Sequence, residues 1–258
     1  MTSALSVRHV SKRFGGNVAV DDVSFEIATG TLTALIGPNG AGKTTLFNII
    51  TNLMPASAGD VLFFGRSTLG MAVEDVASVG LIRTFQSARV FPGMTVLENV
   101  AVGAHRLLRV NTVQQMLSTS RARREERLIY QRSETLLELI GLASERHRPA
   151  AELPMGAQKL LDVIRAVMAA PRLLLLDEPA AGLDDTETRE LMSTLTAIRE
   201  SGIALLMVEH KMDLVMGLAD QIVVLDAGRT VAVGTAEEIQ GNRAVVEAYL
   251  GRGGPERC

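Results

Sequence analysis

The residues best suited to chemistry in this chain form the stretch GPNGAGKT, which runs from Gly37 to Thr44. Glycines at this spacing let successive backbone N–H groups point into one concavity, which can hold phosphate oxygens. Lys43 adds a mobile positive charge for the β- and γ-phosphates, and Thr44 offers a hydroxyl to Mg2+. The pattern therefore predicts a nucleotide-phosphate site, formed by Gly37, Pro38, Asn39, Gly40, Ala41, Gly42, Lys43, Thr44 and Thr45.

A pair of carboxylates ends the apolar run LLLLDEP, Leu173 to Pro179. Consecutive residues of an extended strand point to opposite sides, so Asp177 and Glu178 can have different roles. Asp177, at the end of the strand beside the phosphate loop, can hold Mg2+ through its water shell. Glu178 can then orient or deprotonate the attacking water. Combined with the phosphate loop, this pair predicts hydrolysis of the bound nucleotide.

Two more polar residues stand at the ends of apolar runs. His210 closes the run ALLMVEH, and Gln86 ends the run LIRTFQ. A histidine at a strand end is more often a surface or core residue than a functional one, and an isolated glutamine has no specific meaning. The residues by themselves therefore leave the functions of His210 and Gln86 open.

A phosphate loop of this kind needs a strand before it and a helix after it. Thr31 to Ile36 has the composition of a buried strand, and Lys43 to Leu53 has helical spacing. The same texture returns later, where the apolar runs Leu173 to Leu176 and Ala204 to Val208 enclose the helical segment Asp185 to Glu200. The chain has only 3% aromatic residues, which also suits helices packed on a buried parallel sheet, so the predicted fold class is α/β.

Other regions differ from this core. From Ala4 to Ile27, short β-type runs and turn signals predict an antiparallel hairpin or meander. A further pair of strands is predicted at Asp60 to Phe64 and Leu81 to Phe85. From about Thr95 to Ala151, helix formers and charge clusters predict a helical insertion. Its segment RARREERLIYQR fits either a solvated helix face or a docking surface.

The composition limits the partners of the chain. Its 258 residues have a formal net charge of -3, so there is no excess of Lys and Arg to attract nucleic acid. No apolar run approaches the roughly 20 residues that span a bilayer, and no signal peptide is read at the N-terminus. The single cysteine, Cys258, favours a reducing cytosol. We therefore expect no nucleic acid partner, and a membrane role only through another chain.

Read in order, several sites along the chain resemble the ATP-binding-cassette (ABC) ATPases. They are Gln86, LPMGAQ at Leu153 to Gln158, DEP at Asp177 to Pro179, GLD at Gly182 to Asp184, and His210. The resemblance covers essentially the whole chain and implies one ABC ATP-binding domain over residues 1–258. The fold it implies is an α/β P-loop NTPase with an N-terminal antiparallel β region, a mostly parallel core sheet and a helical subdomain inserted at about 95–160.

The resemblance also implies roles at matching positions. Phe14 would stack on adenine, and His210 would hydrogen-bond the γ-phosphate. Gln86 would reach Mg2+ and the water, and would couple ATP to a partner subunit. Two such subunits would close head to tail around ATP, with Asp184 linking the two sites. The implied catalytic residues are Lys43, Gln86, Glu178 and His210, and the implied metal ligands are Thr44, Gln86 and Asp177.

In that dimer, each ATP would also contact a signature stretch on the other subunit. Here the stretch comprises Leu153, Pro154, Met155, Gly156 and Ala157. It departs from the family's usual L-S-G-G-Q, because Pro154 has neither the hydroxyl nor the backbone N–H expected at that position. Gly156 keeps the close backbone approach. Pro154 alternatively serves only as a helix starter, since proline is favoured in a helix's first turn.

The stretches GLIRTFQ, VFPGMTVLENV and VVEAYLG resemble the ATP-binding subunits of branched-chain amino acid importers. That resemblance implies separate transmembrane channel subunits, a second ATP-binding subunit in a homodimer or heterodimer, a substrate-binding protein, and a place at the cytoplasmic face of the inner membrane. The alternative is a soluble ABC ATPase of iron–sulfur cluster assembly. A DNA-repair ATPase is disfavoured because sustained coiled-coil heptads are absent, and a nonhydrolytic sensor is disfavoured by Glu178 and His210.

Overall fold

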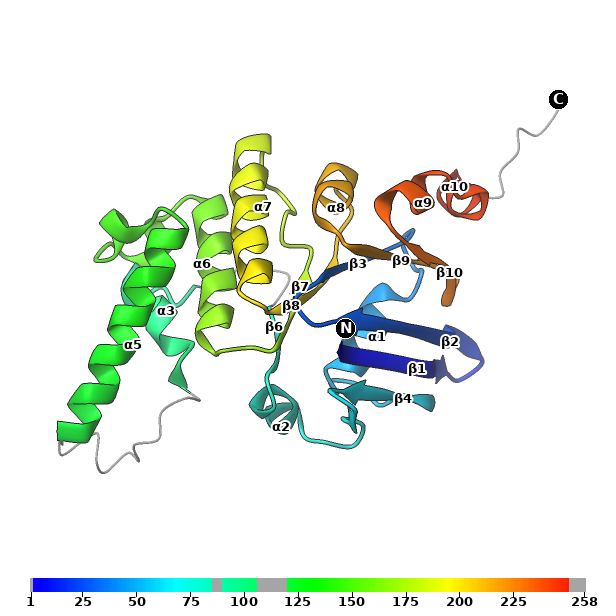
Figure 1. The fold of residues 1–258 in the computed structure, drawn as a ribbon, viewed down its shortest axis with the longest axis horizontal. Helices are drawn as coiled ribbons and strands as arrows, with labels where there is room; N and C mark the ends of the chain where they lie inside the picture. Colours follow the sequence, from blue (N-terminus) through cyan, green and yellow to red (C-terminus); the bar gives the residue numbers. More distant parts are fainter. Residues whose placement is uncertain (1, 85–89, 106–119, 251–258) are drawn as a thin grey trace.

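The computed structural model describes residues 2–84, 90–105 and 120–250. Figure 1 shows two sheets, one above the other, with a group of helices beyond one end of them. In the described ranges, no helix is both long enough and apolar enough to cross a membrane.

The larger sheet has the strand order β10-β9-β3-β8-β7-β6. Its strands are β3 (Leu32–Ile36), β6 (Leu81–Arg83), β7 (Leu173–Asp177), β8 (Ala204–Val208), β9 (Gln221–Asp226) and β10 (Arg229–Gly234). All neighbours are parallel except β10, which pairs antiparallel with β9. Every residue of β3, β7 and β8 is buried, as expected for a parallel sheet covered on both faces. The predicted mostly parallel core is confirmed.

The smaller sheet is antiparallel and has the order β2-β1-β4-β5. It contains β1 (Ser3–Phe14), β2 (Asn17–Ala28), β4 (Ala58–Phe63) and β5 (Arg66–Ser67), so the N-terminal antiparallel prediction is confirmed. Both strands predicted near Asp60 and Leu81 are present, as β4 and β6, but the prediction that they form a pair is wrong. β4 stays in this sheet, whereas α2 (Val73–Ser78) carries the chain to the larger sheet, where Leu81 pairs with Leu173 of β7.

Two buried clusters hold the layers together, and alternate residues of β7 divide between them. Leu173 and Leu175 face the cluster that contains Phe47 of α1 (Lys43–Ile50), between the two sheets. Leu174 and Leu176 face the opposite cluster, to which the other helices contribute. Those helices are α6 (Met155–Met168), α7 (Asp185–Glu200), α8 (Met212–Leu218), α9 (Ala236–Gln240) and α10 (Arg243–Leu250).

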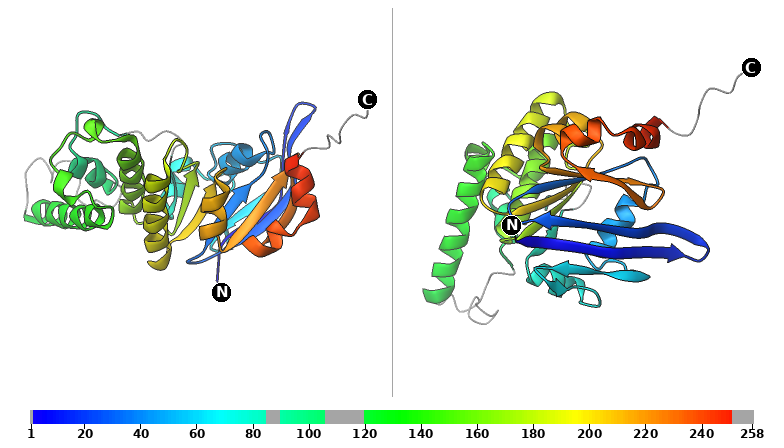
Figure 2. Two further views of the ribbon diagram at one scale, coloured as in Figure 1. Left: turned by 90° about the horizontal axis from the view of Figure 1, so that it is seen from above. Right: turned by 45° about the vertical axis from the view of Figure 1, so that its right-hand side comes forward.

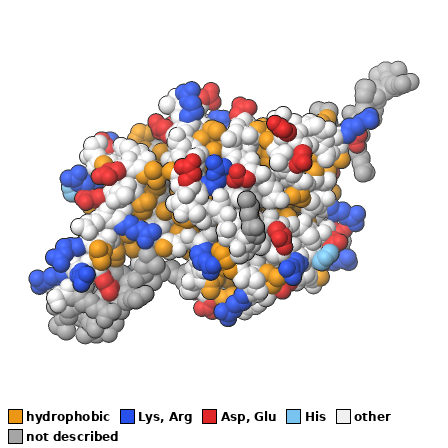
Figure 3. Space-filling view, in the orientation of Figure 1, with side chains coloured by type: hydrophobic (Ala, Val, Ile, Leu, Met, Phe, Trp, Pro, Cys, Tyr) orange, Lys and Arg blue, Asp and Glu red, His pale blue; other side chains and the backbone are white. Residues whose placement is uncertain are grey.

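The group of helices beyond β6 has a buried cluster of its own. Among the described residues, this group contains α3 (Val96–Val102), α5 (Ser120–Leu139), the short 3-10 turns Ala143–Glu145 and Ala150–Glu152, and α6 (Figure 2). Val100, Leu137 and Ile164 are fully buried there. The first part of α5 carries exposed cations at Arg123, Arg124 and Arg127, and Figure 3 shows Lys and Arg gathered at that end of the molecule.

Candidate functional site

The phosphate loop connects the C-terminal end of β3 to the N-terminus of α1, and glycine is required at two of its positions. Gly37 has φ 150 and Gly42 has φ 98, values that residues with a side chain rarely adopt. A Cβ on Gly37 would lie 2.1 Å from the carbonyl oxygen of Leu225, and one on Gly42 would lie 2.4 Å from that of Ala19. The loop is therefore fixed between β9 and β2 by close backbone contacts.

A polar cavity of about 450 Å³ lies over this loop. Asn39 to Thr45 line it together with Glu178, His210, Ala227 and the hairpin residues Asn17, Val18 and Ala19. No side chain caps α1 at Gly42, and its first turn contains no acidic residue. The N–H groups and positive end of α1 are thus available to an anion, as in nucleotide-phosphate sites.

Lys43 is the buried cation of this cavity. Its Nζ donates hydrogen bonds to the carbonyl oxygens of Gly37 at 2.7 Å and Pro38 at 2.9 Å. Burial lowers the pKa of Lys43, and the negative charge of Glu178 opposes that shift. The ammonium is therefore placed within the loop, where phosphate oxygens would replace its carbonyl acceptors.

Glu178 and His210 meet at the wall of the cavity. Glu178 follows β7 in the left-handed conformation, with φ 48, and its N–H donates to the carbonyl of Val208 at the end of β8. His210 Nε2 lies 3.3 Å from Glu178 Oε1. The left-handed turn is uncommon for a residue with a side chain, and it aims the carboxylate at the same cavity as Lys43. The predicted Lys43, Glu178 and His210 are thus brought together.

Asp177 has a partner that sequence reasoning missed. Arg83, the last residue of β6, donates from Nη2 to Asp177 Oδ2 at 2.6 Å and from Nη1 to Asn48 Oδ1 at 2.7 Å. The Asp177 side chain is buried and directly precedes Glu178, which lines the phosphate cavity together with Thr44. A hydroxyl, a carboxylate and nucleotide phosphates are the oxygen donors that Mg2+ uses in such sites, so the residues present fit this ion.

Glu209 is a second residue that was missed, and it connects the segments after β7 and β8. Its side chain is buried, and its carboxylate accepts hydrogen bonds from three backbone N–H groups, those of Ala180 at 2.7 Å, His210 at 2.7 Å and Lys211 at 3.0 Å. In the sequence, it is an ordinary charge at a strand end beside His210. Only the fold places Ala180, two residues after Glu178, against it.

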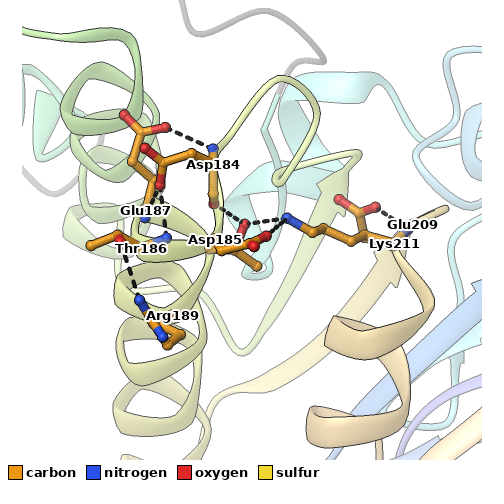
Figure 4. Close-up of polar contacts among 8 residues, drawn as sticks. Asp184, Asp185, Thr186, Glu187, Arg189, Glu209 and Lys211 are labelled. Carbon is orange, nitrogen blue, oxygen red and sulfur yellow. Dashed lines mark hydrogen bonds and ion pairs between the residues drawn. The ribbon is translucent and has the colours of Figure 1, made fainter.

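Asp184 caps α7. Its carboxylate accepts from the N–H groups of Thr186 and Glu187, and the Glu187 side chain accepts from the Asp184 N–H (Figure 4). Lys211 reaches across from the segment after β8 to Asp185 Oδ1 at 3.2 Å and Thr188 Oγ1 at 2.9 Å. The segment that carries Asp184 is thereby tied to the one that carries His210.

The signature stretch from Leu153 to Ala157 lies at the start of α6 and contributes nothing to the lining of the phosphate cavity. Pro154 is at the N-cap with φ -53, one residue before the first turn where the helix-starter alternative would put it. Met155 is exposed, whereas a Cβ on Gly156 would lie 2.3 Å from Glu187 Oε1. Gly156 thus has a packing role against α7 within this chain.

The remaining predicted residues are less constrained by the structure. Phe14 is 47% exposed at the end of β1, with Lys12 Nζ 5.2 Å from its ring centroid. The cavity lining from that hairpin is Asn17 to Ala19, so stacking of Phe14 on adenine stays a prediction. Gln86, two residues after Thr84 in the sequence, lies outside the described residues.

The C-terminal helix also reaches the phosphate loop. Tyr249 of α10 lies near the backbone of Gly37. Partial burial raises the pKa of the Tyr249 phenol, and the Gly37 backbone opposes that shift. VVEAYLG, singled out only by resemblance, therefore includes a residue close to the phosphate loop.

A phosphate loop between a parallel strand and a helix, with a carboxylate and an imidazole on its cavity, defines a nucleotide-hydrolysing P-loop protein. The family model described as ABC transporter matches residues 20–181, and one described as branched-chain amino acid ATP-binding cassette transporter matches residues 229–255. This chain belongs to the ABC transporter family, as an ATP-binding subunit. Members of this family bind ATP and hydrolyse it to drive transport, and the chain is an ATPase of this kind.

Relatives match over nearly their full length. The chain is 41% identical to the high-affinity branched-chain amino acid transport ATP-binding protein LivG of Salmonella typhimurium, over 96% of this chain and 97% of the relative. It is 39% identical to the corresponding protein BraF of Pseudomonas aeruginosa, with the same coverage. This chain also matches a solved structure, a nucleotide-free ATP-binding cassette from an ABC transporter, with a TM-score of 0.82 and 30% sequence identity. The match covers 97% of this chain and 100% of the solved chain. These matches confirm the predicted family and fold.

Proposed function

We propose that this chain powers an importer of branched-chain or related amino acids. The strongest support is that relatives matched over nearly their full length are named as branched-chain amino acid transport ATP-binding proteins. In agreement, residues 229–255 match the family model of branched-chain amino acid ATP-binding cassette transporters. This segment covers β10, α9 and α10 and includes Tyr249, which lies near the Gly37 backbone of the phosphate loop. The relatives and family models named above all describe transport, and none of them describes iron–sulfur assembly.

The residue roles follow from the geometry of the cavity. Lys43 and the N–H groups of α1 would hold the ATP phosphates, and Glu178 would accept a proton from the attacking water. His210, 3.3 Å from Glu178, would donate to the γ-phosphate. Bound Mg2+ neutralises charge on the phosphates, and Thr44, Asp177 and the predicted Gln86 would hold it. Phe14 is assigned to adenine, and Asp184 to the link with a second ATP site.

An apolar groove of about 790 Å³ supports docking to a membrane subunit. It runs between α2 and β6 on one side and α3 and α6 on the other. Leu53, Val73 and Phe91 border it and are 53%, 39% and 43% exposed. Large apolar side chains that gather on one exposed face mark an interaction site. A helix of the transmembrane channel would fit this groove, with its apolar face on these side chains.

The similarity to importer ATP-binding proteins also supports a proposal for the other subunits of the assembly. A second ATP-binding subunit would supply a signature stretch to the cavity above Lys43, because the chain's own stretch at 153–157 does not line it. A separate substrate-binding protein would deliver the amino acid, and the ATPase would lie at the cytoplasmic face of the inner membrane through its channel partners.

Purification of the tagged chain from native membranes tests this proposal. Channel subunits are expected to copurify, and in a heterodimer a different ATP-binding subunit copurifies with them. ATP hydrolysis by the purified complex should rise when a branched-chain amino acid and its binding protein are added. Copurification with soluble cluster-assembly proteins, with no channel subunit, would contradict the importer.

A further inference from the structure

Arg83 is a buried cation that touches two different sites. Its side chain is 14% exposed, and the guanidinium donates to both Asp177 and Asn48, at 2.6 Å and 2.7 Å. Its guanidinium carbon lies 5.5 Å from the centroid of the Phe47 ring. On the other side, the same residue lines the 790 Å³ groove, together with its neighbours Ile82 and Thr84.

These contacts hold Arg83 in one position without satisfying it fully. Its Nε is buried and has no hydrogen-bond partner among the described residues. A buried polar atom without a partner is costly, so the position depends on the two contacts at the Nη atoms. Arg83 also lines the groove, and an arginine fork can pair with a planar acceptor that is placed there.

The pairing matters because Asp177 is the carboxylate assigned to Mg2+. The positively charged guanidinium of Arg83 already lies against this carboxylate, with Nη2 2.6 Å from Asp177 Oδ2. Two positive charges a few ångströms apart repel each other, and the repulsion is strongest where solvent is largely excluded. Arg83 in its present position therefore opposes a metal ion near this oxygen, and its displacement toward the groove would remove that opposition.

We propose that Arg83 is a positioning residue that makes the availability of Asp177 for Mg2+ depend on what occupies the groove. With the groove open to solvent, Arg83 stays on Asp177 and Asn48. An occupant with an acceptor near the wall draws the guanidinium away, so docking favours metal binding. The coupling to the channel rests on the proposed function, whereas the competition between Arg83 and Mg2+ belongs to the isolated subunit.

The first test measures Mg2+ dependence of nucleotide binding by the isolated subunit, with a fluorescent ADP analogue and Mg2+ titrated from zero. Arg83→Met should lower the half-saturating Mg2+ roughly tenfold, while binding without Mg2+ stays near wild type. Arg83→Lys keeps the charge but loses the two-point contact, so it should give a smaller decrease. Arg165→Met is the matched control, because Arg165 lines the same groove and pairs with Asp162.

The second measurement compares the isolated subunit with the assembled transporter. The half-saturating Mg2+ of the wild type should fall on assembly, and that of Arg83→Met should not change. If Arg83→Met does not fold, as judged by its melting curve and Mg2+-free binding, Arg83→Lys decides the question. Wild-type Mg2+ dependence in the folded Arg83 variants, or an equal shift in Arg165→Met, would overturn the inference even if the chain proves to be an importer subunit. An Arg83 effect in the isolated subunit without a channel effect would overturn the coupling alone.

Discussion

At the residue scale, the account depends on Glu178 as the acceptor of the water proton. Its carboxylate lies on the phosphate cavity, 3.3 Å from His210 Nε2. Glu178→Gln should lower ATP turnover by on the order of 10² to 10⁴, the usual contribution of a positioned base. Binding of MgATP should be retained, because Lys43 and the loop backbone are unchanged. A folded Glu178→Gln complex with wild-type turnover would remove Glu178 from the mechanism.

Lys43 gives the complementary result. Lys43→Ala removes the cation that donates into the loop at 2.7 Å and 2.9 Å, and with it the charge for the phosphates. ATP affinity should therefore fall by at least tenfold, since hydrogen bonds to charged groups contribute about 1.5–3 kcal/mol. The measurement is equilibrium binding of an ATP analogue to the isolated subunit. Thermal unfolding without nucleotide serves as the control, and unchanged affinity would contradict the assignment.

Glu209 should act through the residues it positions. Glu209→Gln places an amide among backbone N–H donors, so at least one of the three bonds is lost at a cost of about 1–3 kcal/mol. We expect kcat to fall about tenfold with KM for ATP little changed, because Ala180 and His210 lose their common anchor while the phosphate loop is intact. Glu237→Gln, at an exposed site, should leave kcat unchanged. A rise in KM alone, or no effect, would argue against a positioning role.

The sequence predicted the residues that share a local motif and missed those that depend on tertiary contact. Lys43 and Glu178 each follow a recognisable strand, and strands of one parallel sheet deliver their C-terminal residues to one edge. Arg83 and Glu209 are single charges at strand ends, with no local pattern that separates them from surface charges. Their partners, Asp177 and Ala180, are distant in sequence.

At the scale of elements, the proposal that the channel docks in the apolar groove can be tested by changing the exposed side chains of the groove. Leu53→Glu places a charge at a groove position whose side chain is 53% exposed, so folding should be preserved. A helix docked in the groove would have to bury the unpaired carboxylate, which is costly. Copurification of the channel should be lost, and ATP binding by the isolated subunit should remain. Leu128→Glu on α5, 57% exposed and outside the groove, is the matched control.

The α5 cations provide the alternative docking surface. Arg123→Glu combined with Arg124→Glu reverses charge on the exposed start of α5 without altering the groove. If the groove carries the docking, this pair should assemble normally. Loss of assembly in the α5 pair, with normal assembly of Leu53→Glu, would transfer the docking site to α5.

The elements themselves could be predicted better than their pairing. Fully apolar runs such as Leu173 to Leu176 identified buried strands, and the phosphate loop identified β3 and α1. Nothing in the short runs near Asp60 and Leu81 specifies a sheet, because a strand of three to six residues fits either one. The strand at Leu81 belongs to the larger sheet because α2 leads the chain from one sheet to the other and because Leu81 pairs with the buried strand β7.

At the scale of the whole molecule, a substitution at Pro154 can distinguish a homodimer from a heterodimer. It occupies the N-cap of α6 without a side-chain hydrogen bond, a position where serine is favoured and stabilises by about 1 kcal/mol. Pro154→Ser should therefore be tolerated, and should change hydrolysis at the partner's phosphate loop only. The assay compares ATPase activity with each subunit's catalytic glutamate inactivated in turn. An effect that persists when only Glu178 works would indicate a homodimer.

The central claim is that ATP hydrolysis by this chain drives amino acid import, and uptake tests it most directly. Cells that lack the chain are complemented with wild type or Glu178→Gln at equal protein level, and the initial uptake of labelled leucine, isoleucine and valine is measured. Wild type should restore uptake, whereas Glu178→Gln should assemble with the channel and restore almost none. Equal uptake with both variants, or no dependence of uptake on the chain, would contradict the account.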